Sequence, residues 1–217
     1  MTNQQTNIVK ILKATGFVLC LLPVAWLAWR AYGDHLGANP IETITRDTGV
    51  WTLRLLLITL LVTPLRRLTG WNVLQRLRRM LGLFAFFYAC LHFTTYIWLD
   101  KFFAWPDMVK DVIKRPFITV GFLGFMLLLP LAATSTNAMM KRLGRRWQTL
   151  HRLAYVIPAL GVLHYLWLVK ADIRAPLLYG VLLSVLLGVR LWWLRRKRIA
   201  IQRARPGNNN VATEFGG

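Results

Sequence analysis

Long apolar runs, separated by short clusters of charged residues, dominate the chain. Six of these runs approach the length of about 20 residues that a helix needs to cross the hydrocarbon core of a bilayer. Their predicted bounds are 11–29, 50–65, 81–99, 117–133, 147–169 and 176–194. The pattern therefore predicts an all-α integral membrane bundle of six transmembrane helices, within residues 1–195.

Two segments outside these runs have a pattern of their own. In the stretch 100–115, apolar residues recur at helical spacing (Met108, Val109, Val112 and Ile113), which predicts a short helix lying on the membrane surface. Residues 196–217 begin with a basic cluster and continue as a polar, glycine-rich sequence. We expect this segment to be a disordered cytoplasmic tail.

The composition supports a membrane location. Hydrophobic residues make up 56% of the 217 residues and charged residues only 17%, which is too apolar for a soluble domain with a solvated surface. The formal charge of +20 would suit a nucleic-acid ligand if the basic residues were spread through polar sequence. Here they stand between apolar runs, so we expect no nucleic-acid partner and contact with membrane lipid instead.

The basic residues are distributed unequally between the two sides of the predicted bundle. One side collects 18 Lys and Arg residues, at 10–13, 66–79, 141–152 and 195–205. The other side has nine, together with seven of the eight acidic residues. Because cytoplasmic loops carry the excess of Lys and Arg, this distribution predicts that both termini are cytoplasmic.

Three of the four histidines lie on the third and fifth predicted helices. By the helical rise, His92 lies about 12 Å and His164 about 9 Å below the same membrane border. Two neutral imidazoles at one depth on adjacent helices are suited to be the axial ligands of a haem iron. The alternative is an ordinary interhelical hydrogen bond, and a zinc site would need further ligands at that level.

The third of these histidines, His151, lies about 20 Å deeper on the same helix as His164, at the depth of a second cofactor. On the third helix this level carries Arg78 and Arg79, and arginine does not ligate iron. His151 is therefore the less certain iron ligand. The surrounding cations suit an anion such as a flavin phosphate or a haem propionate. The alternative is that they only set the membrane topology. These cations are Arg78, Arg79, Arg145, Arg146 and Arg152.

Four sequence blocks carry a resemblance to a known family. They are TGVWTLRLLLITLLVTPLRRLTG at 48–70, RRMLGLFAFFYACLHFTTYIWLD at 78–100, KRPFITVGFLGFMLLLPLAATS at 114–135 and LGRRWQTLHRLAYVIPALGVLHYLW at 143–167. The chain resembles the MsrQ (YedZ) family, the haem-binding membrane subunits of bacterial protein-methionine-sulfoxide reductase systems. This family lies within the ferric-reductase-like transmembrane superfamily.

The resemblance implies an electron-transfer subunit of the bacterial inner membrane that binds haem b and FMN. It implies electrons from the quinone pool or a cytoplasmic flavin reductase, delivered to the periplasmic molybdopterin enzyme MsrP. Methionine sulfoxide would then be reduced on that partner, for the repair of oxidised periplasmic proteins. The family's histidines correspond to His92, His151 and His164, and the superfamily's fourth histidine is missing here.

Two other functions fit parts of the sequence. A transmembrane ferric or cupric ion reductase would use the same haem scaffold but pass electrons to a metal ion. A small transporter or structural anchor would place its site near the midplane, often between repeated halves. We find no internal sequence repeat of that kind, which favours the electron-transfer function.

Overall fold

A computed structural model describes residues 3–169 and 171–204, and these residues form helices without a strand among them. The first half contains α1 (Asn3–Tyr32), α2 (Pro40–Thr69), the 3-10 turn η1 (Asn72–Arg76), α3 (Arg78–Thr94) and the π-helical turn η2 (Thr95–Asp100). The second half contains α4 (Trp105–Lys114), α5 (Pro116–Ala133), α6 (Asn137–Leu143), α7 (Arg145–Leu150), the 3-10 turn η3 (His151–Tyr155), α8 (Val156–Leu168) and α9 (Arg174–Ala204). The predicted all-helical class is confirmed.

Five helices within the described residues are long and apolar enough to cross a membrane: Thr6–Tyr32, Pro40–Thr69, Asn72–Asp100, Pro116–Ala133 and Arg174–Lys197. Large apolar side chains point outward from them. On α9, for example, Leu178, Val181 and Val185 are each more than half exposed. A soluble helix would bury such a face, so these helices belong in lipid.

The helix α2 is much longer than the predicted span 50–65. It begins after Asn39, whose side chain accepts a hydrogen bond from the Glu42 N–H (3.3 Å), and Pro40 occupies its first turn. It ends at Gly70, which adopts φ 73° and donates to the Arg66 carbonyl. These caps lie in polar sequence, so hydropathy alone missed the first turns of the helix.

The fifth predicted span, 147–169, is not one continuous α-helix. It divides into α7, η3 and α8, and α8 has only 13 residues. Pro158 explains the division, because its nitrogen cannot donate to the Ala154 carbonyl and its ring pushes against that carbonyl. The preceding turn is therefore a 3-10 turn. The prediction that 147–169 is one uninterrupted transmembrane helix, and with it the total of six, is not confirmed.

The two segments outside the predicted spans have different outcomes. The short helix expected in 100–115 is confirmed as α4, and its position on the membrane surface stays a prediction. Its Asp111 carboxylate contacts the Lys101 ammonium (2.5 Å) and the Arg115 guanidinium (3.2 Å). At the other end, α9 continues to Ala204, past residue 196, where we expected disorder to begin. Residues 205–217 lie outside the described part of the chain.

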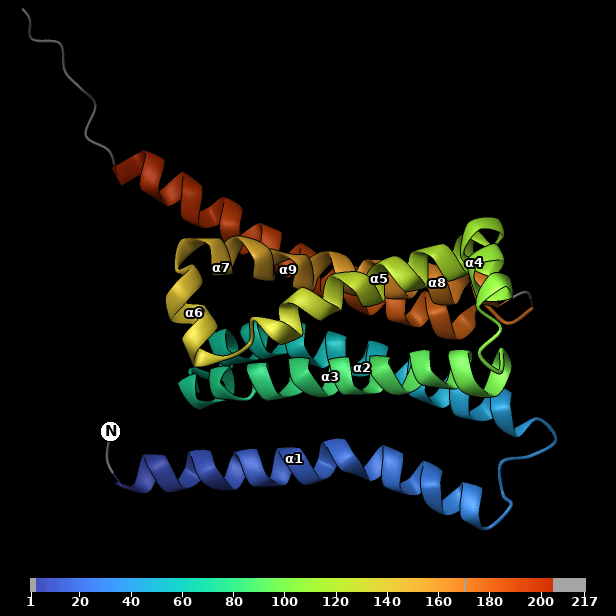
Figure 1. Ribbon diagram of the computed structural model, residues 1–217. Helices are drawn as coiled ribbons and strands as arrows, with labels where there is room; N and C mark the ends of the chain where they lie inside the picture. Colours follow the sequence, from blue (N-terminus) through green and yellow to red (C-terminus); the bar gives the residue numbers. More distant parts are fainter. Residues whose placement is uncertain (1–2, 170, 205–217) are drawn as a thin grey trace, which may run out of the picture.

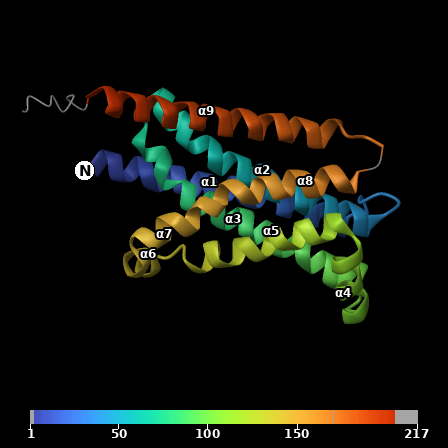
Figure 2. The same ribbon diagram turned by 90° about the horizontal axis from the view of Figure 1, so that it is seen from above.

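The helices form a bundle in which α2 packs mainly on α3 and α5 mainly on α8. Within each pair the two helices run in opposite directions, whereas α3 and α8 run in the same direction (Figures 1 and 2). The start of α1, the end of α9, α6 and α7 share one end of the bundle, which we call the basic end. The α1–α2 and α8–α9 connections and α4 share the other end.

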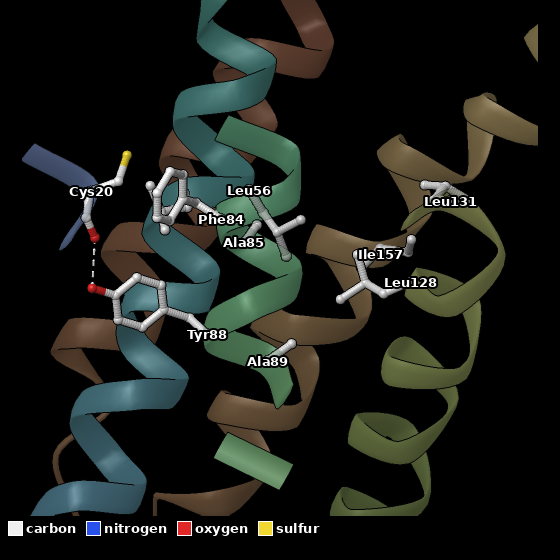
Figure 3. Packing of buried hydrophobic residues seen from close by; sticks show 10 residues of the cluster. Cys20, Leu56, Phe84, Ala85, Tyr88, Ala89, Leu128, Leu131 and Ile157 are labelled. Atoms are coloured by element: carbon white, nitrogen blue, oxygen red, sulfur yellow. Dashed lines mark hydrogen bonds between the residues drawn. The ribbon is translucent and has the colours of Figure 1, made fainter. Parts of the chain in front are cut away.

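The core lies where α1, α2, α3, α5 and α8 meet (Figure 3). Ala85 and Ala89 are buried on α3, and their small side chains allow close packing of the neighbouring helices. Tyr88 attaches α1 to this core. Its hydroxyl donates to the Cys20 carbonyl (2.8 Å) and accepts from the Val24 N–H (3.1 Å), so it bridges two backbone groups one helical turn apart.

Candidate functional site: a histidine pair between two matched helix pairs

The structure brings His92 on α3 and His164 on α8 together, as the sequence predicts. Their ring centres are 6.2 Å apart, and the ring planes are nearly perpendicular, at 78°. Both side chains are partly exposed. Parallel α3 and α8 place the two imidazoles at one level of the bundle.

The two imidazoles are held through the same ring nitrogen. The Nδ1 of His92 lies 2.9 Å from the Thr45 carbonyl oxygen on α2, and the Nδ1 of His164 lies 2.6 Å from the Phe117 carbonyl oxygen on α5. A carbonyl oxygen only accepts, so each Nδ1 carries the proton and donates. Each neutral ring therefore keeps a lone pair on Nε2, the arrangement of a histidine prepared to bind a metal.

A glycine makes room for each histidine. A Cβ atom at Gly49 on α2 would lie 2.9 Å from Cε1 of His92, and one at Gly121 on α5 would lie 2.7 Å from Nδ1 of His164. Neither distance allows an alanine without movement of the imidazole. Glycine at these two positions thus permits α2 and α5 to approach the edge of each ring.

These contacts repeat with one spacing. The residue whose carbonyl accepts the hydrogen bond and its histidine are separated by 47 residues in both pairs. Each glycine follows its carbonyl residue by four positions, one helical turn. The pairs α2–α3 and α5–α8 thus present equivalent histidines from equivalent frames. The sequence analysis found no internal repeat, because only the glycine and the histidine are identical among the residues that form these contacts.

The separation of the two rings fits a metal bound between them. A metal–imidazole bond is about 2 Å long and the ring centre lies about 1 Å beyond the nitrogen, so two axial imidazoles have centres about 6 Å apart. The observed separation of 6.2 Å meets this requirement. Within the described residues there is no cluster of three or more His, Cys, Asp or Glu residues placed to hold a metal, so a bound iron would need further donors of its own, as a porphyrin supplies.

His151, at the basic end, is held differently. Its Nε2 lies 3.1 Å from the Thr134 hydroxyl, which donates its own proton to the Pro130 carbonyl (2.6 Å). The hydroxyl oxygen therefore accepts from Nε2–H, and the nitrogen that is free at His92 and His164 is occupied here. The ring of His151 also stacks on Trp147, with centres 4.0 Å apart.

The five arginines predicted around His151 divide into two groups. We call this part of the bundle, together with His151, the inner level. Arg78 and Arg79 act electrostatically on His151. Arg78 also donates to the Tyr155 hydroxyl (3.4 Å), and Arg79 to the Asn137 side chain (2.7 Å). The other three, Arg145, Arg146 and Arg152, are exposed. Among the described residues, the side-chain contacts of His151 are with Thr134 and Trp147 instead.

Arg190 is a residue of this level that was not predicted from the sequence. It lies within the apolar run of α9 and places its guanidinium 4.2 Å from the centre of the Tyr155 ring. Arg78 contacts the hydroxyl of the same tyrosine, so Arg190 adds a cation to the inner level. Its position inside an apolar run could have indicated it, because an ionisable residue within a membrane span is costly and by default suggests a functional site.

The chain is similar to known membrane proteins. Residues 48–162 match the family described as "Ferric reductase like transmembrane component". Three similar proteins are each called "Protein-methionine-sulfoxide reductase heme-binding subunit MsrQ". The one from Herminiimonas arsenicoxydans is 61% identical over 191 residues, covering 87% of this chain and 88% of its own length. Those from Ralstonia nicotianae and Xanthomonas campestris pv. campestris (strain 8004) are 55% and 54% identical, covering 83% and 84% of this chain and 84% and 85% of their own lengths.

The chain belongs to the MsrQ family. The match to the ferric-reductase-like family also identifies it as a multi-pass membrane protein. The matched residues 48–162 contain His92, His151 and the glycines at 49 and 121, and they end just before His164. The MsrQ relatives are similar over a longer part of the chain.

Proposed function

We propose that this protein carries electrons across the bacterial inner membrane through a haem b held by Nε2 of His92 and of His164. When bound, haem supplies reversible one-electron chemistry at iron. The observation that supports the proposal is the histidine pair itself: rings 6.2 Å apart, each with Nδ1 bonded to a backbone carbonyl. The names of the MsrQ relatives agree with haem as the bound group.

The protein's own contribution is to fix and tune the ligands. The Thr45 and Phe117 carbonyls set the tautomer and orientation of the rings, because each accepts the Nδ1 proton. Gly49 and Gly121 set how closely α2 and α5 approach them. Rigid helices hold all of these groups, and such preorganisation is what a ligand pair of fixed geometry requires.

We place the donor side at the basic end, which the charge distribution assigns to the cytoplasm. There Arg78, Arg79 and His151 would hold the phosphate of an FMN, with Arg145, Arg146 and Arg152 farther out. Guanidinium groups suit a phosphate, and the Trp147–His151 stack offers an aromatic surface for a flavin ring. The donor would be the quinone pool or a cytoplasmic flavin reductase.

The acceptor would be the periplasmic methionine sulfoxide reductase MsrP, docked at the end that carries α4. Sulfoxide reduction would take place on that partner, because the histidine site has ligands for electron transfer and no nucleophile. A ferric or cupric ion reductase would share the family described for residues 48–162. The names of the relatives favour a protein partner as acceptor.

A visible absorption spectrum of the purified protein tests the haem directly. We expect the sharp bands of a low-spin bis-histidine haem b in the reduced protein. A spectrum without haem, after expression with sufficient haem supply, would refute the proposal.

The direction of transfer is tested in membrane vesicles with the double variant Arg78→Gln/Arg79→Gln. Reduction of the haem by the cytoplasmic donor should slow, whereas oxidation of pre-reduced haem by MsrP should be nearly unchanged. The control, Lys141→Gln/Arg142→Gln, removes two exposed charges from the same end and should change neither rate. The reverse pattern would mean that electrons enter at the other end.

A further inference from the structure

A pocket of about 340 Å³ lies beside the histidine pair, on the side of α2 that faces α1, α8 and α9. Its volume is within the range of small-ligand sites. Three arginines line it (Arg30, Arg46 and Arg54), with Asp47 as the single acidic residue. The other polar residues of the lining are Thr43, Tyr165 and Tyr179. The pocket therefore collects more positive than negative charge.

This pocket is continuous with the frame of the histidines. Arg46 directly follows Thr45, whose carbonyl holds His92, and Tyr165 directly follows His164. Adjacent residues on a helix point in directions about 100° apart, as follows from 3.6 residues per turn. The same turns of α2 and α8 thus contact or carry the imidazoles on one face of the helix and line the pocket on the adjacent face.

The ion pair within the pocket leaves two of its three arginines without an acidic partner among the described residues. Asp47 is paired with Arg30, whose guanidinium lies 3.3 Å from its carboxylate. Arg46 has no ion pair with any residue that the structure describes. Arg54 has none there either: its Nε donates to the Tyr179 hydroxyl (2.9 Å), and its guanidinium lies 4.8 Å from the centre of the Trp51 ring.

The position of Arg54 is costly unless the charge is used. It lies in the middle of α2, inside the candidate span Pro40–Thr69. The tyrosine and tryptophan contacts compensate part of the cost through a hydrogen bond and a cation–π interaction. Neither contact neutralises the charge, and a guanidinium keeps several donors in a geometry that suits carboxylate or phosphate.

We propose that this pocket is an anion-binding site in which Arg46 and Arg54 bind carboxylate or phosphate oxygens next to the histidine pair. The anion has two possible sources. One is a soluble phosphate or carboxylate from the aqueous side. The other is the carboxylates of the haem itself, and this second source alone rests on the proposed function.

The first experiment uses the haem-free protein in lipid nanodiscs and inorganic phosphate as the probe. At constant ionic strength, phosphate should raise the thermal midpoint of the wild-type protein and leave Arg46→Gln/Arg54→Gln unchanged. The control Lys110→Gln/Lys114→Gln removes the same charge from exposed positions on α4 and should respond like the wild type. This result identifies the pocket as open to soluble anions.

The second experiment compares the binding of haem and of haem dimethyl ester, whose carboxylates are blocked. If the haem carboxylates occupy the pocket, the ester should bind the wild type about tenfold more weakly than haem, and the double variant should bind both equally. The non-additivity of the ester and the arginine substitutions measures the contact between the haem carboxylates and the two arginines. The control variant should keep the wild-type preference for haem.

A single variant guards against a folding defect, because Arg54→Gln breaks the hydrogen bond to Tyr179. The single variant Arg46→Gln removes a cation without an internal ion pair and should show a smaller loss in the same experiment. Absence of both the phosphate response and the ester preference in the wild-type protein would overturn the proposal. If the wild type bound no haem, the proposed function would fail while the phosphate experiment still decided the pocket.

Discussion

His92 and His164, which we call the outer level, and the inner level around His151 share one sequence spacing but differ in the contacts of their histidines. Arg79 precedes His92 by thirteen residues, and His151 precedes His164 by the same number. Equivalent helix positions thus carry two histidines at the outer level but one histidine and one arginine at the inner level. The outer imidazoles leave Nε2 free, whereas Nε2 of His151 is bonded to Thr134.

The comparison shows that a ligand pair depends on its frame as much as on its histidines. At the outer level each ring has a carbonyl acceptor and a glycine in equivalent positions. At the inner level the ring is held by a hydroxyl and a stacked indole, with arginines nearby. We therefore propose that the first frame suits a metal and the second an anion or an aromatic group.

The largest effect is expected from removing one outer ligand. His92→Ala or His164→Ala should each abolish the low-spin haem spectrum, because the iron would retain only one protein ligand. Absorption and paramagnetic resonance spectra of the purified variants measure this. Retention of a full low-spin signal in either variant would contradict the proposal that His92 and His164 bind one haem iron together.

A smaller but clear effect is expected from the two glycines. Gly49→Ala and Gly121→Ala should each weaken haem binding by about tenfold or more, as observed for groups that orient metal ligands. The methyl group would force the imidazole away from its carbonyl. Gly82→Ala on α3 is the matched control, because a Cβ there has no neighbour within 4 Å; equal losses in all three variants would point to a general effect on helix packing.

His151→Ala should affect the inner level only. We expect the outer haem spectrum to remain and the reduction of haem by a cytoplasmic donor to slow, because the contact with Thr134 and Trp147 is lost. Haem content and the rate of reduction are measured on one preparation. Complete loss of haem, as expected for His92→Ala, would contradict the assignment of His151 to a separate inner level.

The smallest effect concerns α4, at the end of the bundle near the outer pair. The pKa of Asp111 is held below its ordinary value because Lys101 donates a hydrogen bond to it, and the charges of Lys101 and Arg115 act in the same direction. A carboxylate with a lowered folded-state pKa stabilises the protein above its unfolded pKa, near 4. That stability is lost as the pH falls through the lower, folded-state pKa.

Asp111→Asn should therefore lower stability at neutral pH by about 1 kcal/mol or less, and the difference from the wild type should shrink in acid. Thermal unfolding in detergent at pH 7 and below pH 4 tests this. The haem spectrum should not change. A difference that persisted in acid would assign the effect to packing rather than charge.

The sequence by itself determined the membrane bundle, the helices of the histidines and their common level. Each of these depends on hydropathy and on the fixed rise of a helix, which local sequence records. The short surface helix was predictable for the same reason, from its periodic apolar residues. The polar beginning of α2 and the interruption before Pro158 were missed because caps and one proline, rather than hydropathy, decide them.

Only the tertiary structure decided which atoms support the histidines. The carbonyls of Thr45 and Phe117 lie 47 residues from their imidazoles, and backbone carbonyls have no signature in sequence. The same holds for the pocket of Arg46 and Arg54, which have no ion pair among the described residues because Arg30 is paired with Asp47. Such pairings follow from how helices pack against one another, because contact across a bundle depends on distance in space and not on spacing along the chain.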